Sequence, residues 1–267
     1  MTDRGLAATW ASGAAYEPYV GRGSRLVARE FLGWLAVPPA KRWLDVGCGT
    51  GALTATIVAI ASPSHVDAVD TSEGFVAYAR EQVPDPRVRF GVADARALAS
   101  EAASYDAVVS GLVLNFVPDP ARAVAEMARV ARARAPVALY VWDYAGRMEL
   151  MRCFWDAAVA LDAGARDLDE GRRFPICRPE ALATLFHGAG LRAMETRAIE
   201  VPTMFRDFDD YWTPFLGGQG PAPGYAMSLD EGRRAALRER IRTTLATQPD
   251  GSIRLIARAW AVRGVAR

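Results

Sequence analysis

Residues 43–51 read WLDVGCGTG, a short apolar run followed by three glycines in five positions. The run predicts a buried strand, and the glycines predict a tight turn that lets a ligand approach the backbone closely. Residues 52–61 then fit a helix that Ser62-Pro63 closes. A glycine turn between the first strand and its helix forms the nucleotide-binding crevice of an open α/β sheet.

The same alternation of apolar runs and helical stretches continues along the chain. Further strands are predicted at 65–69, 88–92, 105–109 and 137–142, after a first strand at 42–46. Helices are predicted at 73–82, with Ser72 as N-cap, and at 120–133, with Pro120 at the start. Strands that alternate with helices at this spacing indicate βαβ units, and therefore a largely parallel sheet in an α/β fold.

The alternation of strands and helices is limited to residues 42–142, and the chain before and after it follows other patterns. Residues 1–40 are expected to form an N-terminal helical lead-in, and 41–267 one domain with insertions at about 145–178 and 203–249. Strands are predicted at 191–201 and 253–262, on either side of the second insertion. Two strands near the end of the chain, separated by a long insertion, suggest that they form one edge of the sheet and that the insertion forms a lid.

Composition narrows the possible partners. The 267 residues carry 32 basic and 31 acidic side chains, so no broad field is available for nucleic acid or an anionic membrane. Lys41 is the only lysine, which leaves none for a P-loop. The only two histidines, His65 and His187, are far apart in sequence, which argues against a His-rich zinc site. The three cysteines have no C-x-x-C spacing, which fits a reduced, cytoplasmic setting. Neither an apolar leader nor an apolar stretch of membrane-spanning length is found, so no membrane association is predicted. No metal is expected.

The glycine turn alone leaves two cofactors open. Residues 47–52 also satisfy the G-x-G-x-x-A dinucleotide fingerprint, and Asp70 follows Gly47 by 23 residues, near the distance of a ribose-binding acid. An NAD(P)-binding oxidoreductase is therefore one interpretation. Asp45 argues against it, because a carboxylate two residues before the first glycine would repel a pyrophosphate. The same carboxylate suits the sulfonium and ammonium groups of S-adenosylmethionine.

The motifs resemble, in order, those of class I S-adenosylmethionine-dependent methyltransferases. Residues 44–51 (LDVGCGTG) resemble the first motif of that family, and 69–72 (VDTS) resemble its second-strand acid. Residues 91–95 (GVADA) resemble the end of the third strand, and 105–110 (YDAVVS) the fourth strand. The resemblance implies a Rossmann-like, seven-stranded, mostly parallel sheet with flanking helices.

The resemblance also implies a cofactor site. In it Asp45 would face the methionine portion, Asp70 the ribose hydroxyls and Asp94 the adenine amino group. Cys48 is interpreted as a small residue whose backbone meets the ligand, and Arg25 as a candidate for the methionine carboxylate. The complete set of expected cofactor-binding residues is Asp45, Gly47, Cys48, Gly49, Gly51, Asp70, Thr71, Asp94, Ala95, Ser110, Tyr19 and Arg25.

Acceptor-side residues are expected after the fourth and fifth strands and in an aromatic stretch, 205–215, that is either a lid or a small satellite core. They are Asn115, Trp142, Tyr144, Tyr211, Trp212 and Phe215, with Asp143 as the candidate general base. Asn115 is followed by Phe-Val-Pro, so the Asn/Asp-Pro-Pro-aromatic turn of nucleic-acid amino methyltransferases is absent. A small apolar or aromatic acceptor is predicted, and a binding module that has lost catalysis stays open as a further alternative.

Overall fold

The computed structural model describes residues 21–217 and 220–267, so the expectation for Tyr19 lies outside the described residues. The chain divides into two compact units. We call Ser24–Trp142, Ile176–Ile199 and Ala259–Arg267 the sheet unit. We call the described part of the other unit, mainly Asp143–Pro175 and Glu200–Arg258, the insertion unit. It contains most of the two stretches predicted as insertions, while their role as a lid stays a prediction.

A seven-stranded sheet runs through the chain in the order β3-β2-β1-β4-β5-β7-β6. Strands β1 to β5 pair in parallel, and β7 pairs with β5 in antiparallel register. The predicted Rossmann-like, mostly parallel sheet is thus confirmed. The strands are β1 Arg42–Val46, β2 His65–Asp70, β3 Val88–Val92, β4 Ala107–Gly111, β5 Pro136–Trp142, β6 Arg192–Phe205 and β7 Ile253–Val265.

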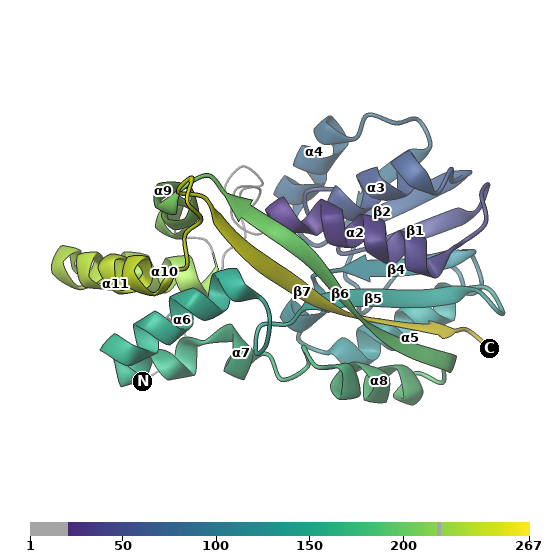
Figure 1. The fold of residues 1–267 in the computed structure, drawn as a ribbon. Helices are drawn as coiled ribbons and strands as arrows, with labels where there is room; N and C mark the ends of the chain where they lie inside the picture. Colours follow the sequence, from purple (N-terminus) through teal and green to yellow (C-terminus); the bar gives the residue numbers. More distant parts are fainter. Residues whose placement is uncertain (1–20, 218–219) are drawn as a thin grey trace. The chain divides into compact units, whose positions relative to one another are not determined.

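Helices cover both faces of the sheet unit (Figure 1). On one face lie α2 (Arg22–Leu35), α3 (Ala52–Ile60) and α4 (Glu73–Gln82). On the other lie α5 (Pro120–Val130) and α8 (Pro179–Gly188). The buried strands read as almost continuous apolar runs, as is typical of a parallel sheet covered on two sides.

The insertion unit is helical around an aromatic core. Its elements are α6 Glu149–Leu161, η3 Ala163–Leu168, α7 Glu170–Arg173, α9 Phe208–Trp212, η4 Thr213–Gly217, α10 Pro221–Ser228 and α11 Glu231–Thr244. Phe154 and Phe215 stack with centroids 4.5 Å apart, and Tyr211 lies 5.5 Å from Phe215. These rings are completely buried, so the aromatic stretch forms a hydrophobic core of its own.

Several boundaries differ from the sequence-based expectation, and three of them show the physical reason. Strand β4 begins at Ala107, because Tyr105 makes only an isolated bridge and its hydroxyl donates to Asp67. Helix α5 ends at Val130, since Ala131 has extended backbone angles. Strand β6 continues to Phe205, where its alternating burial shows that one side faces a core. Tertiary contacts set these limits, and no local sequence signal marks them.

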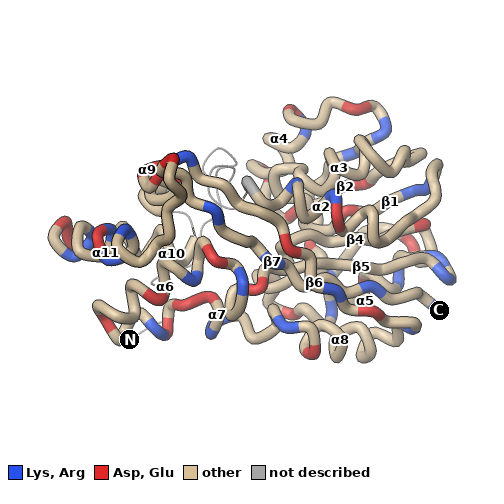
Figure 2. Tube along the Cα trace, viewed as in Figure 1, with Lys and Arg blue, Asp and Glu red and all other residues tan. Residues whose placement is uncertain are grey.

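Charged residues of both signs are interspersed along both units (Figure 2). Several arginines of the sheet unit form ion pairs with acids, such as Arg129 with Glu126 and Arg132 with Asp106. Among the described residues, no helix has the length and apolar character that crossing a membrane requires.

The N-cap of α5 gives a test of this local structure. Asp119 accepts a hydrogen bond from the backbone N–H of Arg122 at 3.0 Å, directly before Pro120. We expect Asp119→Ala to lower the free energy of unfolding by about 1 kcal/mol in a urea titration, while Asp119→Asn stays close to wild type because asparagine also caps. Equal losses in both variants would show that the cap is not the cause.

Candidate functional site

The glycine turn after β1 is fixed by backbone geometry. Gly47 and Gly51 have φ angles of 76° and 86°, which L side chains rarely adopt. A Cβ at Gly47 would lie 2.5 Å from a methyl carbon of Val113. The N–H groups of Gly47 and Cys48 both donate to the carbonyl of Val69, at 2.7 and 2.9 Å. The turn is therefore anchored on β2 and held open toward the carboxyl edge of the sheet.

Asp70 ties the glycine turn to the end of β2. One carboxylate oxygen accepts from the Gly49 N–H at 3.0 Å, and the other from the Ser72 N–H at 2.9 Å. The residue is buried at the place where β2 ends. Each carboxylate oxygen can accept more than one hydrogen bond, so capacity for a vicinal diol remains.

Asp45 is completely buried, and only one of its two carboxylate oxygens has a hydrogen-bond partner. Its Oδ2 accepts a hydrogen bond from the Thr54 hydroxyl at 2.6 Å, whereas Oδ1 has no partner. Burial raises the pKa of Asp45 to about 7, helped by the negative charge of Asp70 and opposed by the Thr54 hydrogen bond. An uncompensated buried carboxylate is costly. The site therefore fits a ligand that brings a cationic or donor group to Oδ1.

Two more unsatisfied groups lie at the same edge of the sheet. Both side-chain amide atoms of Asn115, in the 3-10 turn η2 (Leu114–Phe116) after β4, are buried without a partner. The indole nitrogen of Trp142, the last residue of β5, is likewise unpaired. Since β1, β4 and β5 are neighbours, these groups and Asp45 belong to adjoining strand ends. Buried polar groups are rarely left unpaired unless a ligand or water completes them.

Asp94 follows β3 and is held by its own neighbour. Arg96 donates to both carboxylate oxygens at 2.7 to 3.1 Å. These hydrogen bonds lower the pKa of Asp94 to about 2, so the carboxylate is ionised and oriented. The structure places the other expected cofactor residues individually: Ser110 buried in β4, Ala95 half-buried, Thr71 exposed, and Arg25 exposed on α2.

Cys48 has the character of a packing residue. It is buried, and that burial raises the pKa of its thiol, assisted by the negative charges of Asp45 and Asp70. The nucleophilic form of a cysteine is the thiolate, which this environment suppresses. Its interpretation as a small residue whose backbone meets the ligand stays a prediction.

Asp143 lies at the start of the insertion unit in a network of donors. Its Oδ2 accepts from the Arg258 guanidinium at 2.6 Å and from the Arg147 N–H at 2.9 Å. A Cβ at Gly146 would collide with this carboxylate. The geometry describes a residue that fixes the turn before α6, and a role as general base stays a prediction.

The expected acceptor-side aromatics of the insertion unit each lie against another aromatic ring. Tyr211 is buried and its hydroxyl donates to the Leu150 carbonyl at 3.0 Å. Trp212 lies 6.0 Å from Phe215, and Tyr144 lies 5.6 Å from Phe174, measured between ring centroids. The contacts of Tyr211 and Trp212 with Phe215 describe the satellite core, and contact with an acceptor stays a prediction for these residues and for Tyr144.

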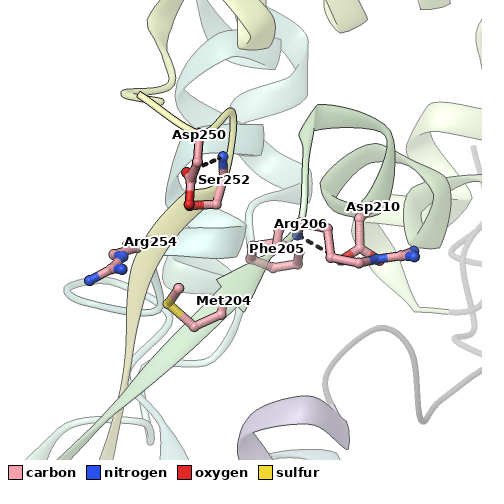
Figure 3. Close-up of a pocket in the computed structure, with 7 residues that line it drawn as sticks. All are labelled: Met204, Phe205, Arg206, Asp210, Asp250, Ser252 and Arg254. Atoms are coloured by element: carbon pink, nitrogen blue, oxygen red, sulfur yellow. Dashed lines mark hydrogen bonds and ion pairs between the residues drawn. The ribbon is translucent and has the colours of Figure 1, made fainter. Parts of the chain in front are cut away.

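A surface cavity of about 610 Å³ lies in the insertion unit, beside the C-terminal end of β6 and the N-terminal end of β7 (Figure 3). Several of its polar side chains bond to one another: Asp250 accepts from Ser252, and Arg206 pairs with Asp210 at 3.3 Å. Arg206 is largely exposed.

Sequence reasoning missed two polar residues. Thr54 satisfies Asp45, and its place three residues after Gly51 on α3 was a usable signal. Glu170 is buried with an unpaired oxygen, although it sits in a charged run that looks solvated. No local pattern distinguishes it from the neighbouring acids.

Part of the chain matches a known protein family. Residues 44–139 match the family described as "Methyltransferase domain". The ubiquinone biosynthesis O-methyltransferase of Hahella chejuensis is 29% identical over 182 residues, covering 67% of this chain and 74% of that protein. The trans-aconitate 2-methyltransferase of Variovorax paradoxus is 32% identical over 106 residues, covering 40% of each. This chain spans only 28% to 48% of the length of several curated relatives.

Solved structures share the fold at low sequence identity. A phosphoethanolamine N-methyltransferase 2 from Haemonchus contortus, in complex with S-adenosyl-L-methionine, is 15% identical with a TM-score of 0.62. The alignment covers 98% of this chain and 59% of that one. At this identity the likeness shows the fold alone.

The matched segment is a class I S-adenosylmethionine-dependent methyltransferase domain, as its motifs indicated. The glycine turn, Asp70 and the half-satisfied Asp45 lie within the matched residues.

The titration of Asp45 gives a test of the site. The pKa of Asp45 is about 7 in the folded protein and about 3.9 in the unfolded chain. Because the folded state binds this proton more tightly, protonation of Asp45 stabilises the fold fully below about pH 4. That part of the free energy of unfolding is lost as the pH rises through about 7. Asp45→Asn removes this loss. We expect the stability advantage of the variant over wild type to grow by roughly 2–3 kcal/mol between about pH 5 and about pH 8 in urea titrations. A difference that does not change with pH would refute the buried, uncompensated carboxylate.

Proposed function

We propose that the whole protein transfers a methyl group from S-adenosylmethionine to a small-molecule acceptor. The observation that carries the proposal is the unpaired Oδ1 of the buried Asp45 beside a conformationally fixed glycine turn. The names of the O-methyltransferase and trans-aconitate methyltransferase relatives support a small acceptor. An apolar or aromatic acceptor, a cytoplasmic location and the absence of nucleic-acid partners remain predictions.

The chain's own residues would hold the cofactor by complementary charge. Asp45 would accept a hydrogen bond from the ammonium group of the methionine portion, and Asp70 from the ribose hydroxyls. Asp94, held by Arg96, would accept from the adenine amino group. Backbone groups of the glycine turn would contact the ligand where no side chain intervenes.

The bound cofactor supplies a methyl group on a sulfonium, which is already a good leaving group. The protein's task is then to orient the acceptor and exclude water, and both lower the barrier without a dedicated triad. A base is needed only where the acceptor must lose a proton as it reacts. Asn115 and Trp142, unpaired at the ends of β4 and β5, are proposed to position the acceptor or the reacting end of the cofactor.

The rival cofactor is NAD(P). A pyrophosphate at the glycine turn would meet the carboxylates of Asp45 and Asp70, and Asp70 already accepts the Gly49 N–H that a phosphate would use. The methyltransferase-domain match argues in the same direction. A binding module without catalysis is the second rival, and release of S-adenosylhomocysteine with any acceptor would exclude it.

The ribose contact can be measured by calorimetry with S-adenosylhomocysteine. We expect binding to wild type, and a loss of roughly 1.5–3 kcal/mol in Asp70→Ala, because a hydrogen bond to a charged group disappears. Glu81→Gln, an exposed carboxylate on α4, is the matched control and should bind as wild type does. Circular dichroism establishes that each variant is folded.

NAD and NADP are titrated in parallel. Heat from NAD alone would overturn the cofactor assignment, and unchanged affinity in a folded Asp70→Ala would overturn the ribose contact.

Asn115 offers a second test, since a binding role and a structural role have opposite consequences. Its amide makes no hydrogen bond in the protein, so Asn115→Leu should leave the free energy of unfolding unchanged or higher. We expect the same variant to lower kcat/KM, or S-adenosylhomocysteine affinity, by about tenfold or more. A destabilised variant with intact binding would assign Asn115 to the fold alone.

A further inference from the structure

Glu170 is a second buried carboxyl group, remote in sequence from the glycine turn. It is the first residue of α7 and only 2% exposed. Its Oε2 accepts a hydrogen bond from the indole N–H of Trp155 on α6. Its Oε1 is buried and has no hydrogen-bond partner. The side chain is thus held firmly at one oxygen and left unsatisfied at the other.

The charges beside Glu170 do not compensate it. The neighbouring Asp169 is also acidic, and it takes the nearby cation: Arg152 donates to both of its oxygens at 2.8 Å. Burial raises the pKa of Glu170 to about 7, and the charge of Asp169 adds to that rise. Hydrogen bonds from the backbone N–H groups of Glu170 and Ala222 and from the Trp155 indole oppose the rise without cancelling it. A buried carboxyl in this situation holds a proton or needs a cation from outside the chain.

The partner of Glu170 belongs to the aromatic core of the insertion unit. Trp155 lies 5.6 Å from Tyr225 and 5.2 Å from Phe154, and Phe154 lies 6.3 Å from Tyr225 in an edge-on arrangement. Aromatic rings attract cations through their quadrupole, and the attraction grows where water is excluded. A carboxylate beside such rings is the chemistry that recognises an organic ammonium group.

We propose that Glu170 and Trp155 form a binding site in the insertion unit for the ammonium group of an organic amine. Its ligand is a protonated amine with an apolar or aromatic body, whose N–H groups donate to the unpaired Oε1. The site does not depend on the proposed methyl transfer. If the amine is the acceptor, the site sets acceptor specificity, and if it is not methylated, the site binds an effector.

The indole proton of Trp155 reports directly on the site, because its hydrogen-bond acceptor is Glu170. We would label the seven tryptophans with ¹⁵N, assign the Trp155 indole signal with Trp155→Phe, and titrate with benzylammonium. Benzyl alcohol is the neutral ligand of matched shape. The expected result is a saturable shift of the Trp155 signal with benzylammonium and none with benzyl alcohol.

The variant Glu170→Gln keeps the shape and an acceptor for the indole but removes the charge. We expect it to bind benzylammonium about thirtyfold more weakly or worse, as loss of one member of a buried charge pair requires. Glu231→Gln, an exposed acid at the start of α11, is the control and should match wild type.

Wild type alone suffices to overturn the proposal if Glu170→Gln does not fold. A Trp155 signal that does not move with benzylammonium, or that responds equally to benzyl alcohol, contradicts an ammonium site. Release of S-adenosylhomocysteine is then measured with S-adenosylmethionine and the bound amine. Release identifies the amine as a methyl acceptor, and binding without release identifies it as an effector. Failure of methyl transfer therefore does not affect the binding result.

Discussion

Parallel pairing of β1 with both β2 and β4 is the constraint on which the cofactor site depends. In that register Asp45 lies opposite Ala68 on one side and Val109 on the other, in the centre of the sheet. All three strands therefore end at one edge, where the glycine turn hydrogen-bonds to Val69 and Asp70. The turn needs no side chain of its own to be rigid, because β2 holds its N–H groups.

This arrangement leaves polar groups buried without partners at the strand ends. A fold optimised for stability alone would pair them or replace them with apolar side chains. Asp45, Asn115 and Trp142 each keep an unsatisfied atom in the sheet unit, and Glu170 does so in the insertion unit. The two buried carboxyls share one physical signature, a pKa raised by desolvation. In both, a proton or a ligand has to supply what the protein does not.

Much of the sheet unit follows from local sequence. Apolar runs bounded by turn residues located β1 and β3 to the residue, and the cap at Ser72 fixed the start of α4. The start of β4 could not be found in this way, because Tyr105 is apolar enough for a strand and is diverted by its hydroxyl contacts to Ser100 and Asp67. Asp45 became a candidate because a carboxylate before the glycine turn suits a cationic ligand, and its contact with a cofactor stays a prediction.

The insertion unit resisted prediction for a physical reason. A dense aromatic stretch has the same sequence pattern whether its rings contact a substrate or pack on one another. The sequence therefore could not decide between a lid and a satellite core for Phe215 and Tyr211. Phe215 stacks on Phe154 and lies against Tyr211, and these contacts describe a core. Glu170 was missed because its burial depends on Trp155, 15 residues earlier, and on the packing of α10.

The most direct test of the account is a crystal structure of the protein with S-adenosylhomocysteine. We expect Asp45 Oδ1 to lie within about 3.2 Å of the ligand's amino group, and a carboxylate oxygen of Asp70 within the same distance of a ribose hydroxyl. A ligand bound elsewhere, or one that leaves Asp45 Oδ1 still unpaired, would contradict the claim that the unsatisfied strand ends are the cofactor site.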